Sequence, residues 1–489
     1  MNVVELLQQQ AAGVPDRNAL IDLTGRSVRT LTYAQFERAA AVAGGVFRRS
    51  GLAAGSSVMV IHPVNADLYV ALAGMLRAGL IPVVCDPGAG HQQFNRACST
   101  VSPKAVFASA AGCLFAATIP ALRGVRYRFS TAGFLGSIKI SRGPADPTIV
   151  ARADDDPALI TFTSGSTGLP KALMRTHSVL RAQLDAIRAT LPLEGVEIIT
   201  MPVVLLANLA SGATSVIPSI DLRKPGAASA DGLAQDILLT QATGIVAPPA
   251  MLDGLLRAEP SKLRSLRRIV TGGGPVMPSM VGALQAILPA AEVHSIYGSS
   301  EAEPIACLAW SSVSDVDVEA MRCGAGLLAG TATPGSTVRV HDGEIIVAGS
   351  HVVPGYLDAS FDAETKLRLD EKIWHRTGDG GYVDPSGRLW LTGRIGAVIR
   401  DRHGIMESFR VECALSFNGA LRRSALIGTS SRRTLLVEPR RGAVVDEMSI
   451  RRAIPWAHVD NVQRVGRLPV DRRHNSKIDY PAVRRMLKR

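Results

Sequence analysis

The chain has 489 residues, enough for a large hydrophobic core and more than one domain. Hydrophobic residues make up 47% of it, yet no run approaches the roughly 18 uninterrupted apolar residues of a membrane-spanning helix. The first residues lack the charged and apolar segments of a signal peptide, and the six cysteines are scattered. We therefore expect a cytoplasmic protein with no membrane span, whose cysteines are buried thiols rather than disulfides or zinc ligands.

The net charge of +12 comes from 54 basic and 42 acidic residues. Arginine pairs gather toward the C-terminal end at Arg432–Arg433, Arg440–Arg441, Arg451–Arg452, Arg472–Arg473 and Arg484–Arg485. A face that binds nucleic acid would interleave such charges with stacking aromatic residues, yet aromatics are only 4% of the chain. We expect a solvated basic surface and no nucleic-acid partner. The alternative is a docking face for an acidic protein such as an acyl carrier protein. If charge reversal at Arg451 and Arg452 left binding of that protein unchanged, this alternative would be excluded.

Strand-like apolar runs alternate with helical patterns along the chain. Strands are predicted at Ser57–His62 and Leu80–Cys85, with an alanine-rich helix over Ala66–Ala78 between them. The same alternation returns at Ser215–Pro218, Gly244–Ala247, Arg268–Thr271 and Glu292–Ile296. The stretch from 126 to 150 is expected to be loop-rich. This pattern predicts βαβ units, hence an α/β protein with largely parallel sheets.

Thr163–Lys171 places two glycines, four hydroxyl side chains and a lysine in nine residues, just after the predicted buried strand Ala158–Phe162. Glycines let a backbone approach an anion, and hydroxyls and an ammonium donate to it, so this loop is expected to bind phosphate. A Walker loop is excluded, because the lysine lies three residues beyond Gly168 and Ala172 follows it. A Ser/Gly linker is disfavoured by the preceding strand. The loop resembles, position for position, the signature of the acyl-adenylate-forming superfamily.

Four more motifs occur in the order that this superfamily shows. The resemblance spans almost the whole chain, and its motifs are Thr271–Pro275, Tyr297–Glu301, Arg376–Tyr382 with Gly387–Arg394, and Asp471–Asp479. Taken singly, Thr271–Pro275 could be a strand–helix turn, and Tyr297–Glu301 a turn with a surface acid. Likewise, the Arg376–Arg394 region could be a hairpin turn, and Asp471–Asp479 a basic tail. Physically, a glycine-rich backbone offers a flat surface to adenine, and a tyrosine ring can stack on it.

The resemblance implies roles for individual residues. Glu301 would bind Mg²⁺, Ser300 would contact phosphate, Asp379 and Arg394 would hold the ribose, and Lys477 would reach the attacking carboxylate and the α-phosphate. His177 aligns with a histidine near the loop and is expected to position other groups rather than act as a base. The nucleotide-binding set is Thr163, Ser164, Gly165, Ser166, Thr167, Gly168, Lys171, Gly273, Gly274, Pro275, Tyr297, Gly298, Ser299, Asp379 and Arg394.

The resemblance also implies two domains, a large adenylate-forming domain over 1–394 with stacked, mostly parallel sheets and helices, and a small, mobile α+β domain over 395–489. Within the superfamily the chain looks most like the β-lactone synthetases of bacterial olefin biosynthesis and related fatty acyl-CoA synthetases. The segments that carry this impression are Met201–Asn208, Gly212–Pro218, Ala247–Leu252, Tyr297–Pro304 and Val470–Ile478. Gly396 stands where a charged or polar hinge residue is usual. It either permits the rotation by which the small domain changes role between the half-reactions, or reflects a rotation that is less constrained because no thiol must be admitted.

By this resemblance, ATP and Mg²⁺ are the expected cofactors, and a fatty or 3-hydroxy fatty acid is the expected substrate. The acid becomes an acyl-adenylate, whose own hydroxyl then displaces AMP and closes a β-lactone. The alternative is a ligase that passes the acyl group to coenzyme A or to an acyl carrier protein, which would be a partner together with any pathway enzyme. A catalytically silent nucleotide-binding homologue is a third interpretation, disfavoured because all the charged site residues are present.

Overall fold

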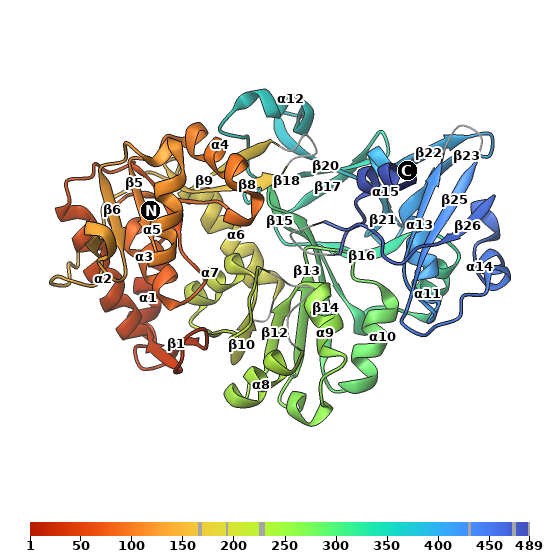
Figure 1. Ribbon diagram of the computed structural model, residues 1–489, viewed down its shortest axis with the longest axis horizontal. Helices are drawn as coiled ribbons and strands as arrows, with labels where there is room; N and C mark the ends of the chain where they lie inside the picture. The colour runs from red at the N-terminus through yellow and green to blue at the C-terminus, as the bar shows by residue number, and fades with distance from the viewer. Residues whose placement is uncertain (165–168, 192–193, 224–229, 429–431, 472–475, 488–489) are drawn as a thin grey trace. The chain divides into compact units, whose positions relative to one another are not determined.

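The computed structural model describes residues 1–164, 169–191, 194–223, 230–428, 432–471 and 476–487 (Figure 1). The chain divides into two compact units. The first unit comprises Met1–Ile220, Ser300–Glu303 and Gly349–Ile373. The second unit comprises Asp221–Ser299, Pro304–Ala348 and Trp374–Arg489.

A seven-stranded sheet forms the centre of the first unit, in the order β7-β6-β5-β3-β4-β8-β9. Its strands are β3 (Ser57–Ile61), β4 (Ile81–Val84), β5 (Ala105–Ala108), β6 (Tyr127–Ser130), β7 (Ile138–Lys139), β8 (Pro157–Ser164) and β9 (Pro170–Thr176). The pairs are parallel except β8 with β9. The predicted βαβ unit is confirmed as β3, α3 (Ala66–Arg77) and β4. The stretch from 126 to 150 is less irregular than expected, since it supplies β6 and β7.

Helices surround this sheet and close the first unit. Besides α3, they are α1 (Glu5–Gly13), α2 (Tyr33–Arg49), α4 (His91–Val101), α5 (Ala110–Thr118), α6 (His177–Thr190), α7 (Pro202–Ser211) and the short α12 (Asp362–Thr365). A capping box between Thr32 and Gln35 starts α2. A methyl group at Gly74 of α3 would lie 2.7 Å from Cβ of Ala43, so glycine permits the close packing of α2 on α3.

The first unit also contains four further paired strands, in the order β10-β11-β1-β2. These are β1 (Asn18–Asp22), β2 (Arg29–Thr32), β10 (Val196–Ile199) and β11 (Thr214–Ile217). Strand β11 confirms the strand predicted at 215–218 and is buried along its whole length. A strand buried on both faces is apolar without alternation, which is why this run could be recognised in the sequence.

The second unit begins with helices and parallel strands, as predicted. They are α8 (Ala230–Thr240), β12 (Gly244–Ala247), α9 (Pro249–Leu255), β13 (Arg268–Gly272), α10 (Pro278–Ile287) and β14 (Glu292–Ser299). Strand β13 pairs in parallel with both β12 and β14. Parallel neighbours end at the same edge of a sheet, so the glycines after β13 and the Tyr-Gly-Ser end of β14 share one edge.

An antiparallel part follows, which the expectation of largely parallel sheets did not include. Its strands run in the order β17-β18-β20-β21-β16-β15. They are β15 (Ala302–Ala309), β16 (Leu327–Ala332), β17 (Thr337–His341), β18 (Glu344–Ala348), β20 (Lys372–Val383) and β21 (Arg388–Arg394). Tight turns make this arrangement possible: between β17 and β18 both Asp342 and Gly343 have positive φ. Asp-Gly is a strong hairpin signal that the sequence analysis left unused.

Residues after 394 form short α and β elements. They are β22 (Val398–Asp401), β23 (Gly404–Glu407), α13 (Ser408–Leu415), β24 (Leu421–Gly428), β25 (Arg433–Pro439), α14 (Glu447–Ala453), β26 (Asn461–Arg464) and α15 (Tyr480–Leu487). Figure 1 draws β25 and β26 in blue beside α13. Two apolar clusters draw all their residues from 399–486. This local core fits the predicted C-terminal domain, whose boundary at 394 and mobility stay predictions.

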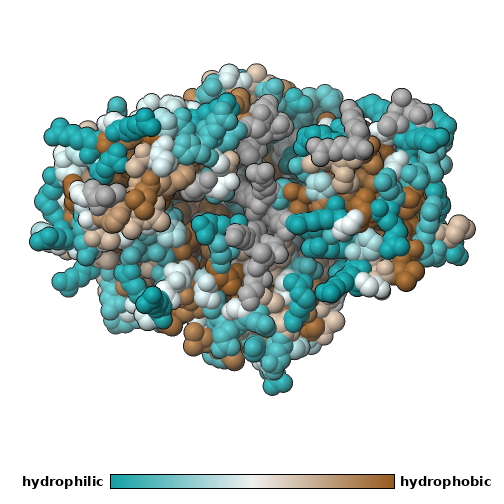
Figure 2. All heavy atoms as spheres, viewed as in Figure 1, coloured by the Kyte–Doolittle hydropathy of each residue, from teal (hydrophilic) through white to brown (hydrophobic). Residues whose placement is uncertain are grey.

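The arginine pairs near the C-terminal end are not uniformly solvated. Arg433 is 1% exposed and forms an ion pair with Asp401, which is 2% exposed, so the expectation of a surface residue is wrong there. This guanidinium lowers the pKa of Asp401 to about 2. Arg451 pairs with Glu447 and also donates to the carbonyl of Val459. Elsewhere hydrophilic side chains cover much of the face shown in Figure 2.

All six cysteines are free thiols. Cys85, Cys98 and Cys413 are buried, whereas Cys113 and Cys307 are half-buried and Cys323 is exposed, so the expectation of buried thiols holds for only three. Burial raises the pKa of Cys85 and of Cys98 to about 12. Within the described parts of the chain, every helix is too short or too polar to cross a membrane.

Candidate functional site

The predicted phosphate loop is the turn of a β-hairpin in the first unit. Strands β8 and β9 are antiparallel, with Thr163 opposite Lys171 and Ser164 opposite Pro170. Thr163 is half-buried near the end of β8. The predicted contacts at Gly165, Ser166, Thr167 and Gly168 lie outside the described residues.

Lys171 lies beside aromatic rings. Its side chain is 5% exposed, and Nζ lies 4.8 Å from the ring centre of Phe361 and 5.6 Å from that of Tyr356. The ammonium of Lys366 lies 5.9 Å from the ring centre of Tyr356 and donates to the carbonyl of Val353. Aromatic faces attract cations, and the ring of Tyr356 contacts two ammonium groups, those of Lys171 and Lys366.

Glu301 contacts the same tyrosine. The phenol of Tyr356 donates to Oε1 of Glu301 at 2.6 Å, and the carboxylate is 9% exposed. The backbone on both sides is fixed, because Val353 N donates to the Glu301 carbonyl at 2.8 Å and Arg175 Nη2 donates to the Ser300 carbonyl at 2.6 Å. Lys171 and Glu301, 130 positions apart in sequence, therefore meet at one ring.

Burial changes the titration of the groups around Glu301. It raises the pKa of Tyr356, and the negative charge of Glu301 adds to the effect, so the phenol keeps its proton. Burial lowers the pKa of Lys366 to about 8, against the opposing attraction of Glu301 and Asp362. A carboxylate beside cations and a neutral donor is a suitable ligand for a hard divalent cation such as Mg²⁺. The residues present thus fit the predicted metal role of Glu301.

His177 has a structural position at the start of α6. Its side chain is 2% exposed, and Nδ1 accepts a hydrogen bond from the backbone N–H of Val3 at 3.1 Å. Burial, with a smaller contribution from Arg152, lowers its pKa to about 4. The imidazole is therefore neutral near pH 7 and its Nδ1 lone pair is used, which suits the positioning role predicted for it.

In the second unit, Tyr297, Asp379 and Arg394 form one cluster. Asp379 on β20 lies opposite Arg394 on β21, and their side chains form an ion pair at 3.1 Å. The phenol of Tyr297 donates to Oδ2 of Asp379 at 2.9 Å. Thr377 orders both partners, since its hydroxyl accepts from Asp379 N and its carbonyl accepts from Arg394 Nη1. Burial and then the charge of Asp379 raise the pKa of Tyr297.

The glycine-rich turn after β13 contacts the loop that carries Lys477. Gly273 has φ 76°, a conformation that favours glycine, and a methyl group at Gly274 would lie 2.6 Å from Oγ of Ser476. Asp471 closes the loop, because its Oδ1 accepts from the backbone N–H groups of Ser476 at 3.0 Å and of Lys477 at 2.8 Å. The structure therefore brings the glycine-rich motif that begins at Thr271 close to the motif that carries Lys477.

The remaining predicted residues lie nearby along the chain. Pro275 follows this turn and is half-buried, as are Gly298 and Ser299 at the end of β14. Oγ of Ser299 lies 3.5 Å from Nε2 of His375, a buried residue that the sequence analysis did not single out.

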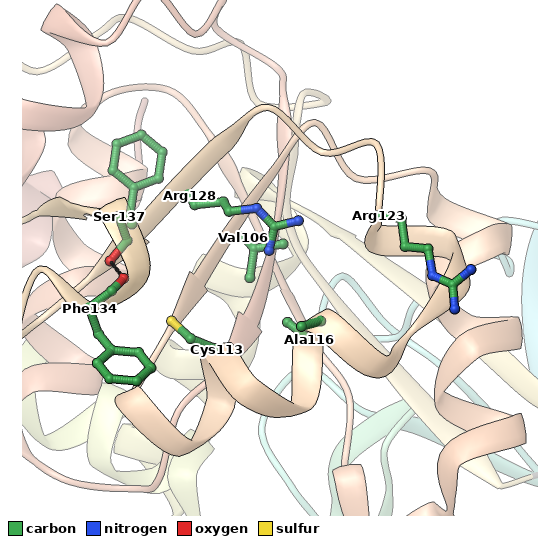
Figure 3. Close-up of a pocket in the computed structure, with 9 residues that line it drawn as sticks. Val106, Cys113, Ala116, Arg123, Arg128, Phe134 and Ser137 are labelled. Atoms are coloured by element: carbon green, nitrogen blue, oxygen red, sulfur yellow. Dashed lines mark hydrogen bonds between the residues drawn. The ribbon is translucent and has the colours of Figure 1, made fainter.

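A cavity of about 330 Å³ lies elsewhere in the first unit (Figure 3). Val106, Cys113, Arg123, Arg128 and Phe134 are among the residues that line it, and none of the predicted site residues does so. In Figure 3 the guanidinium of Arg128 extends over Val106, and the thiol of Cys113 lies below. The cavity is separate from the predicted nucleotide-binding residues.

Several side chains that contact the predicted site residues were not recognised from the sequence. Tyr356, Lys366 and Phe361 belong to a segment in which the sequence showed no recognised motif. Asp471 stood inside the Lys477 motif, and its position six residues before the lysine was a usable signal, since Asp side chains commonly close loops by accepting backbone N–H groups.

Comparison with known proteins identifies the family. The sequence profile described as AMP-binding enzyme matches residues 7–357. The chain is 28% identical to an olefin beta-lactone synthetase of Xanthomonas campestris pv. campestris, over 98% of this chain and 96% of that protein. It is 26% identical to 4-coumarate–CoA ligase 3 of Oryza sativa subsp. japonica, over 87% of this chain and 80% of that protein.

The fold agrees with this match. The amide bond synthetase McbA from Marinactinospora thermotolerans superposes with a TM-score of 0.84 at 22% identity, over 99% of both chains. The expected α/β architecture of adenylate-forming enzymes is thereby confirmed. The chain belongs to the AMP-binding enzyme family and is an acid-activating ligase of the AMP-forming type.

Proposed function

We propose that this enzyme converts a 3-hydroxy carboxylic acid, of the fatty acid class, into a β-lactone, with ATP cleaved to AMP and pyrophosphate. The observation that carries the proposal is the similarity to an olefin beta-lactone synthetase along almost the full length of both chains. The aliphatic character of α7, which has Leu205 and Leu209 among its buried residues, is compatible with an alkyl substrate.

The first step is common to the family. A carboxylate oxygen of the acid attacks the α-phosphorus of ATP, a new P–O bond forms, and pyrophosphate leaves. Lys477 would lie between the attacking carboxylate and the phosphate, where its ammonium reduces the repulsion of like charges. Lys171 and Ser300 serve the triphosphate, and Asp379 with Arg394 serves the ribose. Mg²⁺, bound through Glu301, would neutralise phosphate charge.

The second step uses the substrate's own hydroxyl. The 3-hydroxyl oxygen attacks the acyl carbon of the adenylate, the bond from that carbon to the phosphate oxygen breaks, and AMP leaves as the hydroxyl loses its proton. The product is lighter than the acid by one water, whose elements are found in AMP and pyrophosphate. Holding the hydroxyl beside the acyl carbon supplies most of the required acceleration, since intramolecular attack needs no second substrate.

Mass spectrometry of the products tests this function. The purified protein is incubated with ATP, Mg²⁺ and a long-chain 3-hydroxy acid, with and without coenzyme A. A product lighter than the acid by one water, formed without coenzyme A, is expected. A thioester that appears only with coenzyme A would instead assign the reaction of the 4-coumarate–CoA ligase relative.

Lys477→Ala tests the first step separately. We expect the variant to fold, by circular dichroism, and to lose adenylate formation by a factor on the order of 10²–10³, because one transition-state cation is removed. Release of pyrophosphate with the same acid and ATP is the measurement. Lys139→Ala, at an exposed position on β7, is the matched control and should release pyrophosphate at the unmodified rate. Equal rates in both variants would remove Lys477 from the mechanism.

A further inference from the structure

The backbone around Tyr356 is tied to the strand that carries Lys171. Leu357 N donates to the carbonyl of Ala172 at 2.9 Å, and Tyr356 pairs with Leu173 as an antiparallel bridge. Tyr356 N in turn donates to Oδ1 of Asp362 at 2.9 Å. These bonds leave the ring of Tyr356 little freedom, since its backbone is held both by β9 and by its own loop.

The phenol of Tyr356 points at the carboxylate of Glu301 from this fixed backbone. Tyr356 is 8% exposed and packs with Leu173, Val179 and Val353 in one apolar cluster. In such surroundings water competes weakly with the 2.6 Å hydrogen bond to Oε1 of Glu301. A carboxylate has about four acceptor positions, and the phenol of Tyr356 occupies one of them on Glu301.

The neutral character of this partner matters for metal binding. A guanidinium bonded to the same oxygen would compete with a metal cation for it, whereas a protonated phenol orients the carboxylate without adding a positive charge. The two lysines at this site contact the ring of Tyr356, with Nζ of Lys171 at 5.6 Å and Nζ of Lys366 at 5.9 Å from its centre.

We propose that Tyr356 is a positioning residue that fixes the carboxylate of Glu301 for the divalent cation of the ATP complex. The inference rests on the proposed metal role of Glu301 and extends it to a residue that lies outside the recognised motifs. Tyr356 touches neither the metal nor the reacting atoms; it acts through Glu301. Its ring packs against the lysines, and its hydroxyl alone carries the positioning.

Tyr356→Phe isolates the hydroxyl, because the ring and its contacts with both lysines are retained. The probe is Mn²⁺ added to protein that is in excess over ATP, so that little free ATP chelates the ion. Its dissociation constant is measured by electron paramagnetic resonance of the free ion. We expect Tyr356→Phe to weaken Mn²⁺ binding about 10- to 100-fold, the usual effect of losing a hydrogen bond to a charged group. ATP binding without a divalent cation should stay within about twofold of the unmodified protein.

Two further variants distinguish a failure of the role proposed for Tyr356 from a failure of the metal role proposed for Glu301. Tyr382→Phe removes the hydroxyl of a 38% exposed tyrosine on β20 and should leave Mn²⁺ binding unchanged. Glu301→Gln should weaken Mn²⁺ binding, and adding Tyr356→Phe to it should have no further effect. Mn²⁺ binding by Tyr356→Phe equal to that of the unmodified protein, with Glu301→Gln impaired, would overturn the role of Tyr356 alone. An unimpaired Glu301→Gln would overturn the metal role of Glu301 as well.

Discussion

Each unit of the enzyme has one carboxylate predicted to bind the ATP complex, and in each unit a tyrosine donates to it, but the surroundings of the two carboxylates differ. In the first unit Glu301 accepts from the neutral phenol of Tyr356. In the second unit Asp379 accepts from Tyr297 and also forms an ion pair with Arg394, whose side chain is 51% exposed. The phenol adds no positive charge to Glu301, whereas the guanidinium bonded to Asp379 offsets the charge of that carboxylate, which suits Asp379 better to uncharged hydroxyl groups.

Glu301→Gln should have the largest effect on the rate, because it removes the charge that distinguishes the first carboxylate. The amide keeps the size of the side chain but removes the negative charge, so we expect pyrophosphate release to fall by a factor on the order of 10² or more. Steady-state rates at several Mg²⁺ concentrations are the measurement. A rate that excess Mg²⁺ restores completely would show that the charge of Glu301 contributes to metal affinity and nothing else.

Asp379→Asn should have a smaller effect of another kind. Loss of the charge-assisted hydrogen bonds to a bound ribose should raise KM for ATP about tenfold, while kcat changes little. The comparison of ATP with 2′-deoxy-ATP sharpens the test, because the variant should discriminate less between them. Equal discrimination by the variant and the unmodified enzyme would separate Asp379 from the ribose.

Gly274→Ala probes the contact between the glycine-rich turn and the Lys477 loop. The added methyl group would lie 2.6 Å from Oγ and 2.7 Å from Cβ of Ser476, so the loop must shift. We expect adenylate formation to slow about fivefold, since a shift near 1 Å misplaces the lysine. Ser476→Gly in the same chain should restore most of the rate. Failure of this rescue would show that the loop does not approach Gly274 during catalysis.

Replacing His177 should have the smallest effect, and this effect is on the free energy of unfolding rather than on the reaction rate. Its pKa is lowered to about 4 in the folded state, so between pH 6.5 and 4 the unfolded chain binds a proton that the folded chain does not. The free energy of unfolding should therefore fall by about 1 kcal/mol as the pH drops from 7.5 to 6. His177→Gln should lack this part of the slope in urea titrations. Identical slopes for both proteins would contradict the neutral, buried imidazole.

The sequence predicted one cluster of the site better than the other, and for a physical reason. Asp379 and Arg394 stand on strands joined by a short turn, so local pairing alone brings them together. Lys171, Glu301 and Tyr356 come from three distant segments, and their contact depends on packing that no local pattern encodes. The same limit applies to the fold: the buried parallel strands were predictable as apolar runs, whereas the antiparallel strands from 302 to 394 carry mixed patterns.

Trp456 offers an optical consequence of the packing after residue 394. It is the only one of the four tryptophans in the predicted C-terminal domain, and its ring contacts Gly324 so closely that a methyl group there would overlap it. The guanidinium of Arg410 lies 5.6 Å from the ring centre. Rotation of residues 395–489 as a body would take this indole away from Gly324 and into a more aqueous environment. The emission wavelength of Trp456, in a protein whose other tryptophans are replaced by phenylalanine, would then report any such rotation without an attached dye.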